Sequence, residues 1–471
     1  LRLGPGLLGG GLIFLGGLFL MRLPRELPRG EIAGATLARA AWLAVLLLFC
    51  YQYVMVARYS VDLPFYEEWE FFEPEALQRG LSLAWLFQHF GTNQQVVVPT
   101  KLMAWLDFKL FALDFVRLKL MNYAVFGCLL VWLGLFARRV AGEGARLVPC
   151  FMLFLVSPLA YEVHAASFQS GETFVMLFGT GMLWYAVTDR TSWRDTLLFA
   201  LCGLLAIFSM HTGVVVAALL LVCRSLYLLS RIRCGELPGR TGYGAMALSG
   251  GVILPGIAYW LSGFGPPPAG SPPWLLPTEG KFWAQFFNLL AYGFGFDTPN
   301  VLPGIACLLL LLVPLVLLLA NRETRWRPAT WQVLPAILVL LALTMMITLG
   351  RGNMAGSIKL SRYTLYLSPL ILFGALAWWL ALRRGRKAYA VLGLFWLFCA
   401  GAFLDNWHYG VYRDLQHSDI LNLECVESFA NGGGDGVCPE THGKPIGPFF
   451  TNARRLDISF TRQFSPLLQP K

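Results

Sequence analysis

The chain has 471 residues, of which 56% are hydrophobic and only 14% are charged, and its mean hydropathy is +0.59. A soluble globular domain carries about 25% charged residues, so the composition excludes that class. Many continuous apolar runs approach the ~20 residues that cross about 30 Å of hydrocarbon, whereas a β-barrel would show short alternating strands. The sequence therefore predicts an all-α polytopic membrane protein. Its net charge of +10 is better explained by cytoplasmic loops than by nucleic-acid binding.

About eleven spans (10–13) are expected, within a membrane module that covers 37–405. The expected spans are 37–57, 119–137, 146–161, 172–188, 195–210, 212–230, 243–264, 299–320, 331–349, 363–382 and 387–405. The preceding segment 1–36 holds a Gly-rich apolar stretch at 7–21, which is short for a span. It is an extra helix, an interfacial segment or part of a signal sequence, and the residues do not decide between these.

Arginine and lysine residues gather in alternate loops. The clusters are Arg138, Arg139 and Arg146; Arg190 and Arg194; Arg231, Arg233 and Arg240; Arg322, Arg325 and Arg327; and Arg383, Arg384, Arg386 and Lys387. The positive-inside rule assigns these loops to the cytoplasm. The first long loop, 58–118, and the tail, 406–471, are then expected on the outer side.

The first outer loop opens with the stretch PFYEEWEFFEPE (64–75), in which glutamates alternate with aromatic residues. The acidic residues here are Asp62, Glu67, Glu68, Glu70, Glu73 and Glu75. Aromatic anchors would hold the first four at the headgroup level, where mutual repulsion and lost hydration raise carboxyl pKa values. Such groups suit a general base, or a metal or cationic partner. The alternative is a solvated loop end, which fits Glu73 and Glu75 best.

Two helices lying in the membrane interface are expected behind this stretch, one between Pro74 and Gly91 and one at 99–119. A polar hinge that begins at His89 separates them, and His89 is a candidate substrate-binding residue.

Two further outer loops carry candidate ligand-binding residues. The loop 349–366 contains Arg351, Lys359 and Arg362, followed by Tyr363. These residues are suited to bind a phosphate. The alternative is that they are exceptions to the positive-inside rule, tolerated because lipid headgroup phosphates balance their charge. In 157–174, the candidates for binding sugar hydroxyls are Tyr161, Glu162, His164, Gln169 and Glu172, which equally suit helix capping. Glu70 is a further substrate-binding candidate in the first loop.

The order DLPFYEEWEFF, then two interfacial helices, then GRG…SRY resembles the GT-C superfamily of membrane glycosyltransferases, in an uncharacterised bacterial branch. The resemblance implies a GT-C-like fold and inverting sugar transfer from a polyprenyl-phosphate donor to a glycan, lipid or protein acceptor. It implies Glu67 or Glu68 as catalytic base with Asp62 as the alternative, and a divalent metal (Mg²⁺ or Mn²⁺) that is compatible but not required. The family's acidic pair commonly includes Asp, whereas this chain has Glu67–Glu68.

The resemblance further implies a multi-pass protein of the bacterial inner membrane with its active face in the periplasm or outside. Alternatives are a transporter or flippase of lipid-linked saccharides, or a polysaccharide polymerase or ligase of another fold. Nearly charge-free spans weigh against transport. In the tail, Cys425 and Cys438 bracket a Gly-rich turn and are predicted to form a disulfide in an oxidising compartment.

Overall fold

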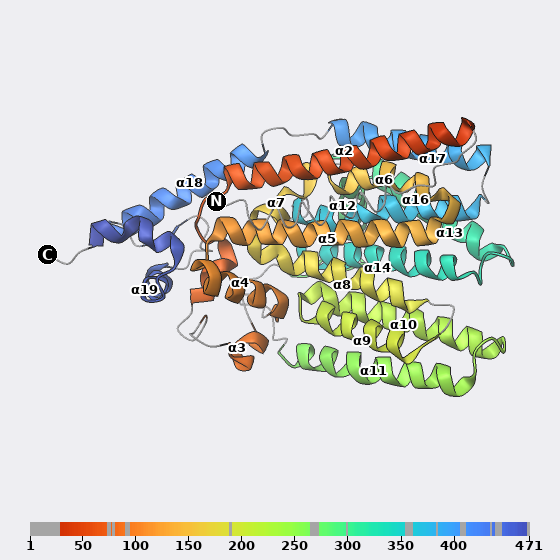
Figure 1. Ribbon diagram of the computed structural model, residues 1–471, viewed down its shortest axis with the longest axis horizontal. Helices are drawn as coiled ribbons and strands as arrows, with labels where there is room; N and C mark the ends of the chain where they lie inside the picture. Colours follow the sequence, from red (N-terminus) through yellow and green to blue (C-terminus); the bar gives the residue numbers. More distant parts are fainter. Residues whose placement is uncertain are drawn as a thin grey trace.

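The computed structural model describes residues 29–72, 77, 81–89, 95–187, 191–263, 273–297, 300–353, 361–382, 385–405, 411–433, 436–438 and 445–468. They form an elongated bundle whose long helices run along its long axis (Figure 1). These are α2 (Arg29–Tyr59), α5 (Phe115–Ala141), α10 (His211–Arg233), α11 (Gly239–Ser262), α13 (Leu302–Ala320), α14 (Pro328–Arg351) and α17 (Arg386–Asp405). Shorter bundle helices are α6 (Val148–Leu155), η3 (Pro158–Ala160), α7 (Tyr161–Ala165), η4 (Ser167–Gln169), α8 (Ser170–Ala186), α9 (Trp193–Ile207), α12 (Gly280–Gly293), η5 (Ser361–Tyr363), α15 (Thr364–Leu367) and α16 (Pro369–Ala381).

Nine stretches among the described residues are long and apolar enough to cross a membrane. This confirms the all-α polytopic class predicted from composition. The expected spans 172–188 and 195–210 form α8 and α9, but these have only 17 and 15 residues, fewer than the ~20 of a typical span. Eleven spans therefore remain a prediction.

The centre of the bundle is the stretch that ends in α16. The most apolar part of Ser361–Ala381 is 83% buried, and α16 packs against α5, α13 and α14. By contrast, the corresponding parts of α2 and α11 are only 33% and 28% buried. Helices that are apolar on all sides but little covered by protein are suited to face lipid.

The two ends of the bundle differ in content. One end, the arginine end, holds the basic last turns of α5 (Arg138, Arg139) and α10 (Arg231, Arg233) and the start of α17. The other, the tail end, holds α7 and the first-loop segments η1 (Tyr66–Phe72), α3 (Leu83–Phe87) and α4 (Val98–Phe111). It also holds the tail helices α18 (Val411–Ala430), α19 (Gly447–Arg455) and η7 (Ser459–Leu468), at the left of Figure 1.

The prediction of a single helix at 99–119 is wrong, because the helical structure is interrupted between α4 and α5. Ala112 and Leu113 adopt left-handed conformations (φ 57° and 54°), and the Asp114 carboxylate then caps α5 by accepting from the backbone amides of Val116 and Arg117. Asp is a strong N-cap residue, so a new helix starts here. The predicted helix between Pro74 and Gly91 is limited, among the described residues, to α3.

A buried lysine on α4 fixes α3. The Lys101 ammonium is fully buried and donates to the carbonyl oxygens of Trp85 (2.7 Å) and Gln88 (2.8 Å) at the end of α3. These oxygens have no partner within a helix of this length, and a cation there also complements the helix dipole. The end of α3 is thereby held against α4.

The tail is an integral part of the tail end. Ser459 Oγ donates to Asp62 Oδ2 at 2.5 Å, and its backbone amide donates to the carbonyl of Ala112 at 2.8 Å. The ring of Phe460, which is fully buried, lies 5.6 Å from that of Trp69 and 5.8 Å from that of Phe72. The tail therefore covers the acidic stretch of the first loop.

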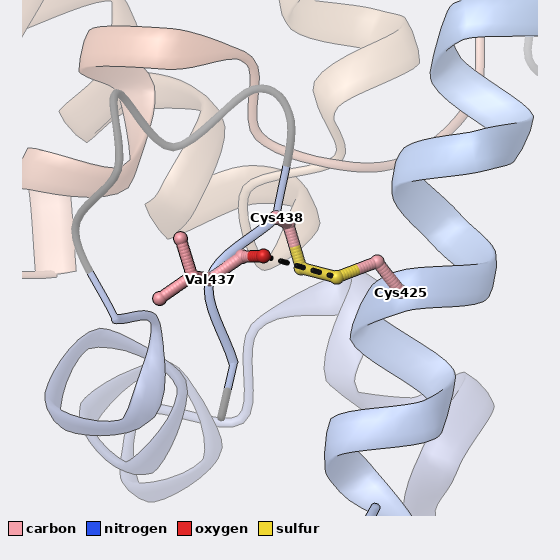
Figure 2. The surroundings of a disulfide bond; sticks show 3 residues. All are labelled: Cys425, Val437 and Cys438. Atoms are coloured by element: carbon pink, nitrogen blue, oxygen red, sulfur yellow. Dashed lines mark hydrogen bonds between the residues drawn. A yellow bond between two sulfur atoms is a disulfide. The ribbon is translucent and has the colours of Figure 1, made fainter. Parts of the chain in front are cut away.

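A disulfide closes the tail. Cys425 and Cys438 are bonded, with Cα atoms 5.7 Å apart, and the Val437 carbonyl oxygen lies 3.8 Å from Cys425 Sγ (Figure 2). The bond joins α18 to the segment that leads toward α19. Residues 73–76, which include Glu73 and Glu75, and residues 406–410 lie outside the described part of the chain.

We expect the stability of the protein to fall as pH rises from about 4 to 7 because of Asp107 on α4. Asp107 is fully buried, and neither carboxylate oxygen accepts a well-formed hydrogen bond from any described residue. Desolvation raises its pKa to about 7, aided by the Asp114 and Asp62 charges and opposed by the Asp114 amide and Arg117. The folded state thus keeps a proton that the unfolded state loses near pH 4, so ionisation of Asp107 disfavours folding.

Asp107→Asn removes this titration while keeping the shape. In nanodiscs, the melting temperature of this variant should match that of the wild type near pH 4 and exceed it at pH 8. The corresponding gain in the free energy of unfolding at pH 8 is on the order of 1–4 kcal/mol. Equal pH dependence of the two proteins would contradict this assignment.

Removing the disulfide should open the tail locally. The double substitution Cys425→Ser and Cys438→Ser releases a loop of sequence separation 13, for which chain entropy predicts a loss of about 3 kcal/mol. Limited proteolysis followed by mass spectrometry should show several-fold faster cleavage within 411–468. Cys234→Ser, an exposed position at the arginine end, serves as the control. Unchanged cleavage in the double variant would argue against a stabilising disulfide.

Candidate functional site

Glu68, one of the two predicted bases, is fully buried and bound to protein donors. Its Oε2 accepts from the Phe65 amide at 2.9 Å. Its Oε1 accepts from the Phe168 amide at 2.9 Å and from the Ser167 hydroxyl. These bonds join η1 to η4, so the carboxylate holds the first loop onto the start of α8.

The pKa of Glu68 reflects the same surroundings. Desolvation raises it above its ordinary value, while the Lys119 ammonium and the three hydrogen bonds lower it in turn. Three of its roughly four lone pairs already accept from protein donors and the group is shielded from solvent, which leaves little capacity to take a proton from a substrate.

Asp62, the alternative base, is also occupied. Its Oδ1 accepts from the Phe115 amide at 2.9 Å, at the start of α5, and its Oδ2 accepts from Ser459. Glu70 is buried. Glu67 alone among these four carboxylates is half-exposed, so it is the one that a substrate could reach.

A second group of residues forms what we call the charged cluster: Glu162, Gln169, Glu172, His211, Arg351 and Arg362. They come from α7, η4, α8, α10, α14 and η5. Two of its loops are joined directly: the Arg362 amide donates to Glu162 Oε2 at 3.3 Å, and the Glu162 amide donates to Ser361 Oγ at 3.0 Å. Hydrogen bonds thus join the two predicted ligand-binding loops, 157–174 and 349–366.

Gln169 links Glu172 to Arg362 within this cluster. With its amide oriented to satisfy both neighbours, its nitrogen donates to Glu172 Oε1 at 3.2 Å and its oxygen accepts from Arg362 Nη1 at 3.3 Å. Glu172 is 4% exposed, and its Oε2 has no hydrogen-bond partner among the described residues. The Arg362 guanidinium also lies 5.4 Å from the ring centre of Tyr363. Arg362 is therefore held in one position by its neighbours.

Electrostatic interactions extend the cluster to the first loop. Glu172 interacts with Arg362, Glu162, Arg351 and Glu67, and His211 interacts with both arginines. The α9–α10 turn that presents His211 is tight, because a Cβ added at Gly213 would collide with the Ala206 carbonyl. Glu67, Arg351 and Arg362 are thus all within electrostatic range of one buried carboxylate.

Three predicted binding residues lie elsewhere. His164 is 1% exposed and sits between the rings of Tyr123 and Phe126 (4.8 and 4.6 Å), as a packed core residue does. His89 stacks on Tyr259 of α11, with ring centres 6.0 Å apart. Lys359 falls within 354–360, outside the described residues.

Lys119 was not among the sequence candidates, although the sequence contains a signal for it, whereas Glu172 was one of the residues predicted to bind sugar hydroxyls. Glu172 stands in the first turn of an apolar helix, and Lys119 lies within the first turns of a membrane helix. A charge next to an apolar run must find a partner on burial, which makes such positions informative. Lys119, 1% exposed, is paired with Asp419 of α18 at 3.4 Å.

A metal centre is not evident in the part of the chain that the structure describes, where no group of three or more His, Cys, Asp or Glu residues is arranged to hold an ion. The cluster's two arginines offer the chemistry of an anion site instead, since guanidinium groups bind phosphate oxygens in pairs.

The chain matches no protein-family model, no curated protein and no solved structure.

Proposed function

We propose that the protein is a membrane glycosyltransferase that moves a sugar from a polyprenyl-phosphate donor to an acceptor at the tail end of the bundle. The observation that supports this most is the gathering of half-exposed Glu67 and two arginines, Arg351 and Arg362, around Glu172. A base and an anion-binding pair in one place are what such a transfer needs.

In the proposed reaction, the acceptor hydroxyl oxygen attacks the anomeric carbon as the bond from that carbon to the phosphate oxygen breaks. Glu67 takes the hydroxyl proton, and Arg351 and Arg362 stabilise the charge that develops on the departing polyprenyl phosphate. Attack opposite to the leaving group inverts the anomeric configuration. Glu162 and Gln169 act as positioning residues, because they hold the backbone and the guanidinium of Arg362.

The proposal places the protein in the bacterial inner membrane, with the arginine end in the cytoplasm and the tail end in the periplasm or outside. Two features support this orientation: the basic loops lie at one end and the disulfide at the other, and thiols generally stay reduced in the cytosol. Membrane lipids and the lipid-linked donor are the partners expected, with a glycan, lipid or protein as acceptor.

The two adjacent glutamates provide a matched pair of variants. Glu67→Gln should lower the rate of transfer by about 10²–10⁴, the range for loss of a general base. Glu68→Gln should instead lower the melting temperature, because an amide nitrogen would face the Phe65 amide or the Ser167 and Phe168 donors, at a cost of about 1–3 kcal/mol.

The assay uses the purified protein in nanodiscs with a panel of polyprenyl-phosphate monosaccharides. Wild-type rates in Glu67→Gln would exclude Glu67 as the base. Lack of turnover by the wild type with every donor and acceptor tested would overturn the proposed activity.

Orientation is testable through the exposed native thiol of Cys234, which follows α10 at the arginine end. A membrane-impermeant maleimide should label it only after intact bacteria are permeabilised, whereas Glu279→Cys, exposed at the opposite end, should react in intact cells. The reverse pattern would invert the proposed topology.

A further inference from the structure

Three aromatic rings with an arginine at each end lie at the arginine end of the bundle, where α10 packs against α14. We call them the aromatic row: Tyr227 of α10, Trp331 of α14, and Trp326 in the loop before α14. The ring centres of Tyr227 and Trp331 are 5.6 Å apart, and the rings of Trp331 and Trp326 stack at 6.1 Å with 11° between their planes. The Arg231 guanidinium lies 5.8 Å from the Tyr227 ring centre, and that of Arg325 lies 5.4 Å from the Trp326 ring centre.

The aromatic row runs from the interior of the bundle to its surface. Tyr227 is 4% exposed, Trp331 is half-buried and Trp326 is 47% exposed. Tryptophan is enriched where a membrane helix meets the lipid headgroups, because its ring is apolar and carries one polar N–H group. Since Trp326 comes just before α14, a candidate membrane span, its exposed ring is expected at the level of the headgroups.

Positive charge exceeds negative charge around the aromatic row. The segments 231–236 and 321–327 contain five arginines and only two glutamates, Glu236 and Glu323. Glu236 pairs with Arg231 at 3.3 Å. By contrast, no described residue forms an ion pair with Arg325, and its Nε has no hydrogen-bond partner among them. The half-buried Arg325 is therefore a cation beside an exposed indole ring that still lacks an anionic partner.

We propose that Arg325 and the aromatic row bind the headgroup of an anionic phospholipid from the leaflet at the arginine end. A guanidinium group binds phosphate oxygens in pairs, and the neighbouring Trp326 ring would contact the glycerol and the first part of the acyl chains. The local surplus of arginines favours an anionic headgroup over a zwitterionic one. This site lies away from the charged cluster, and the proposal does not depend on sugar transfer.

Lipid binding is tested by native mass spectrometry of the full-length protein in detergent, titrated with phosphatidylglycerol or with phosphatidylcholine. The wild type should bind phosphatidylglycerol several-fold more tightly. The double substitution Arg325→Gln and Trp326→Leu should weaken that binding by about fivefold or more, the factor that corresponds to about 1 kcal/mol for one basic residue at an anionic surface. Equal affinities of the wild type for the two lipids would overturn the proposal.

A matched control separates a specific site from general attraction to positive charge. Trp193 and Arg194 form an exposed pair of the same composition at the start of α9, the helix that precedes α10. The double substitution Trp193→Leu and Arg194→Gln removes the same charge and the same kind of ring, and it should leave phosphatidylglycerol binding unchanged. An equal loss of binding in both double variants, or no loss in the Arg325 and Trp326 variant, would refute the site.

Two further measurements address folding and the source of the phosphate. If the melting temperature of the Arg325 and Trp326 variant falls in phosphatidylcholine nanodiscs, Arg325→Gln alone, which keeps all three rings, replaces it and should show the same loss of binding. Glycerol 1-phosphate in millimolar excess should leave phosphatidylglycerol bound to the wild type. Its displacement of the lipid would assign the site to soluble phosphate compounds and would contradict the proposed lipid site.

Discussion

The buried ammonium group of Lys119 is the interaction on which the tail end depends. It lies 3.4 Å from Asp419 of the tail and 3.5 Å from the Val61 carbonyl, and it acts electrostatically on Glu68. Through these partners it joins the first membrane-crossing helices, the acidic stretch and α18. Removing one member of such a buried set typically costs about 3–5 kcal/mol, because the remaining charge has no solvent to replace its partner. Loss of any one of these partners is therefore expected to destabilise the whole tail end.

The same physics divides the acidic stretch into two kinds of residue. Burial forces Glu68 and Asp62 to use their oxygens on backbone amides and hydroxyls, so that they organise loops. Glu67 is only half-buried, so solvent and substrate can reach it. One residue step along a short helical turn is enough to separate a structural carboxylate from an accessible one.

Much of the bundle could be predicted from the sequence, because spans of about 20 apolar residues and alternating basic loops are local signals. The break before α5 also had a local signal in Asp114, which was missed because the apolar pattern continues across it. The candidate site was harder. That Gln169 would connect Glu172 to Arg362, almost 200 residues further on, depends on how distant helices pack. Likewise, the sequence shows that Glu67 and Glu68 are adjacent but not which one points inward.

The position of α18 has a consequence for biogenesis. Proteins are made from the N-terminus onward, so the helices that carry Glu67, Glu172 and both arginines enter the membrane before α18 has left the ribosome. The tail can pack against the first loop only after α18 has been made and has paired Asp419 with Lys119. A nascent or truncated chain that ends before residue 411 would hold the charged cluster but lack this cover and the Cys425–Cys438 bond. The protein thus carries a built-in delay between membrane insertion and a complete tail end.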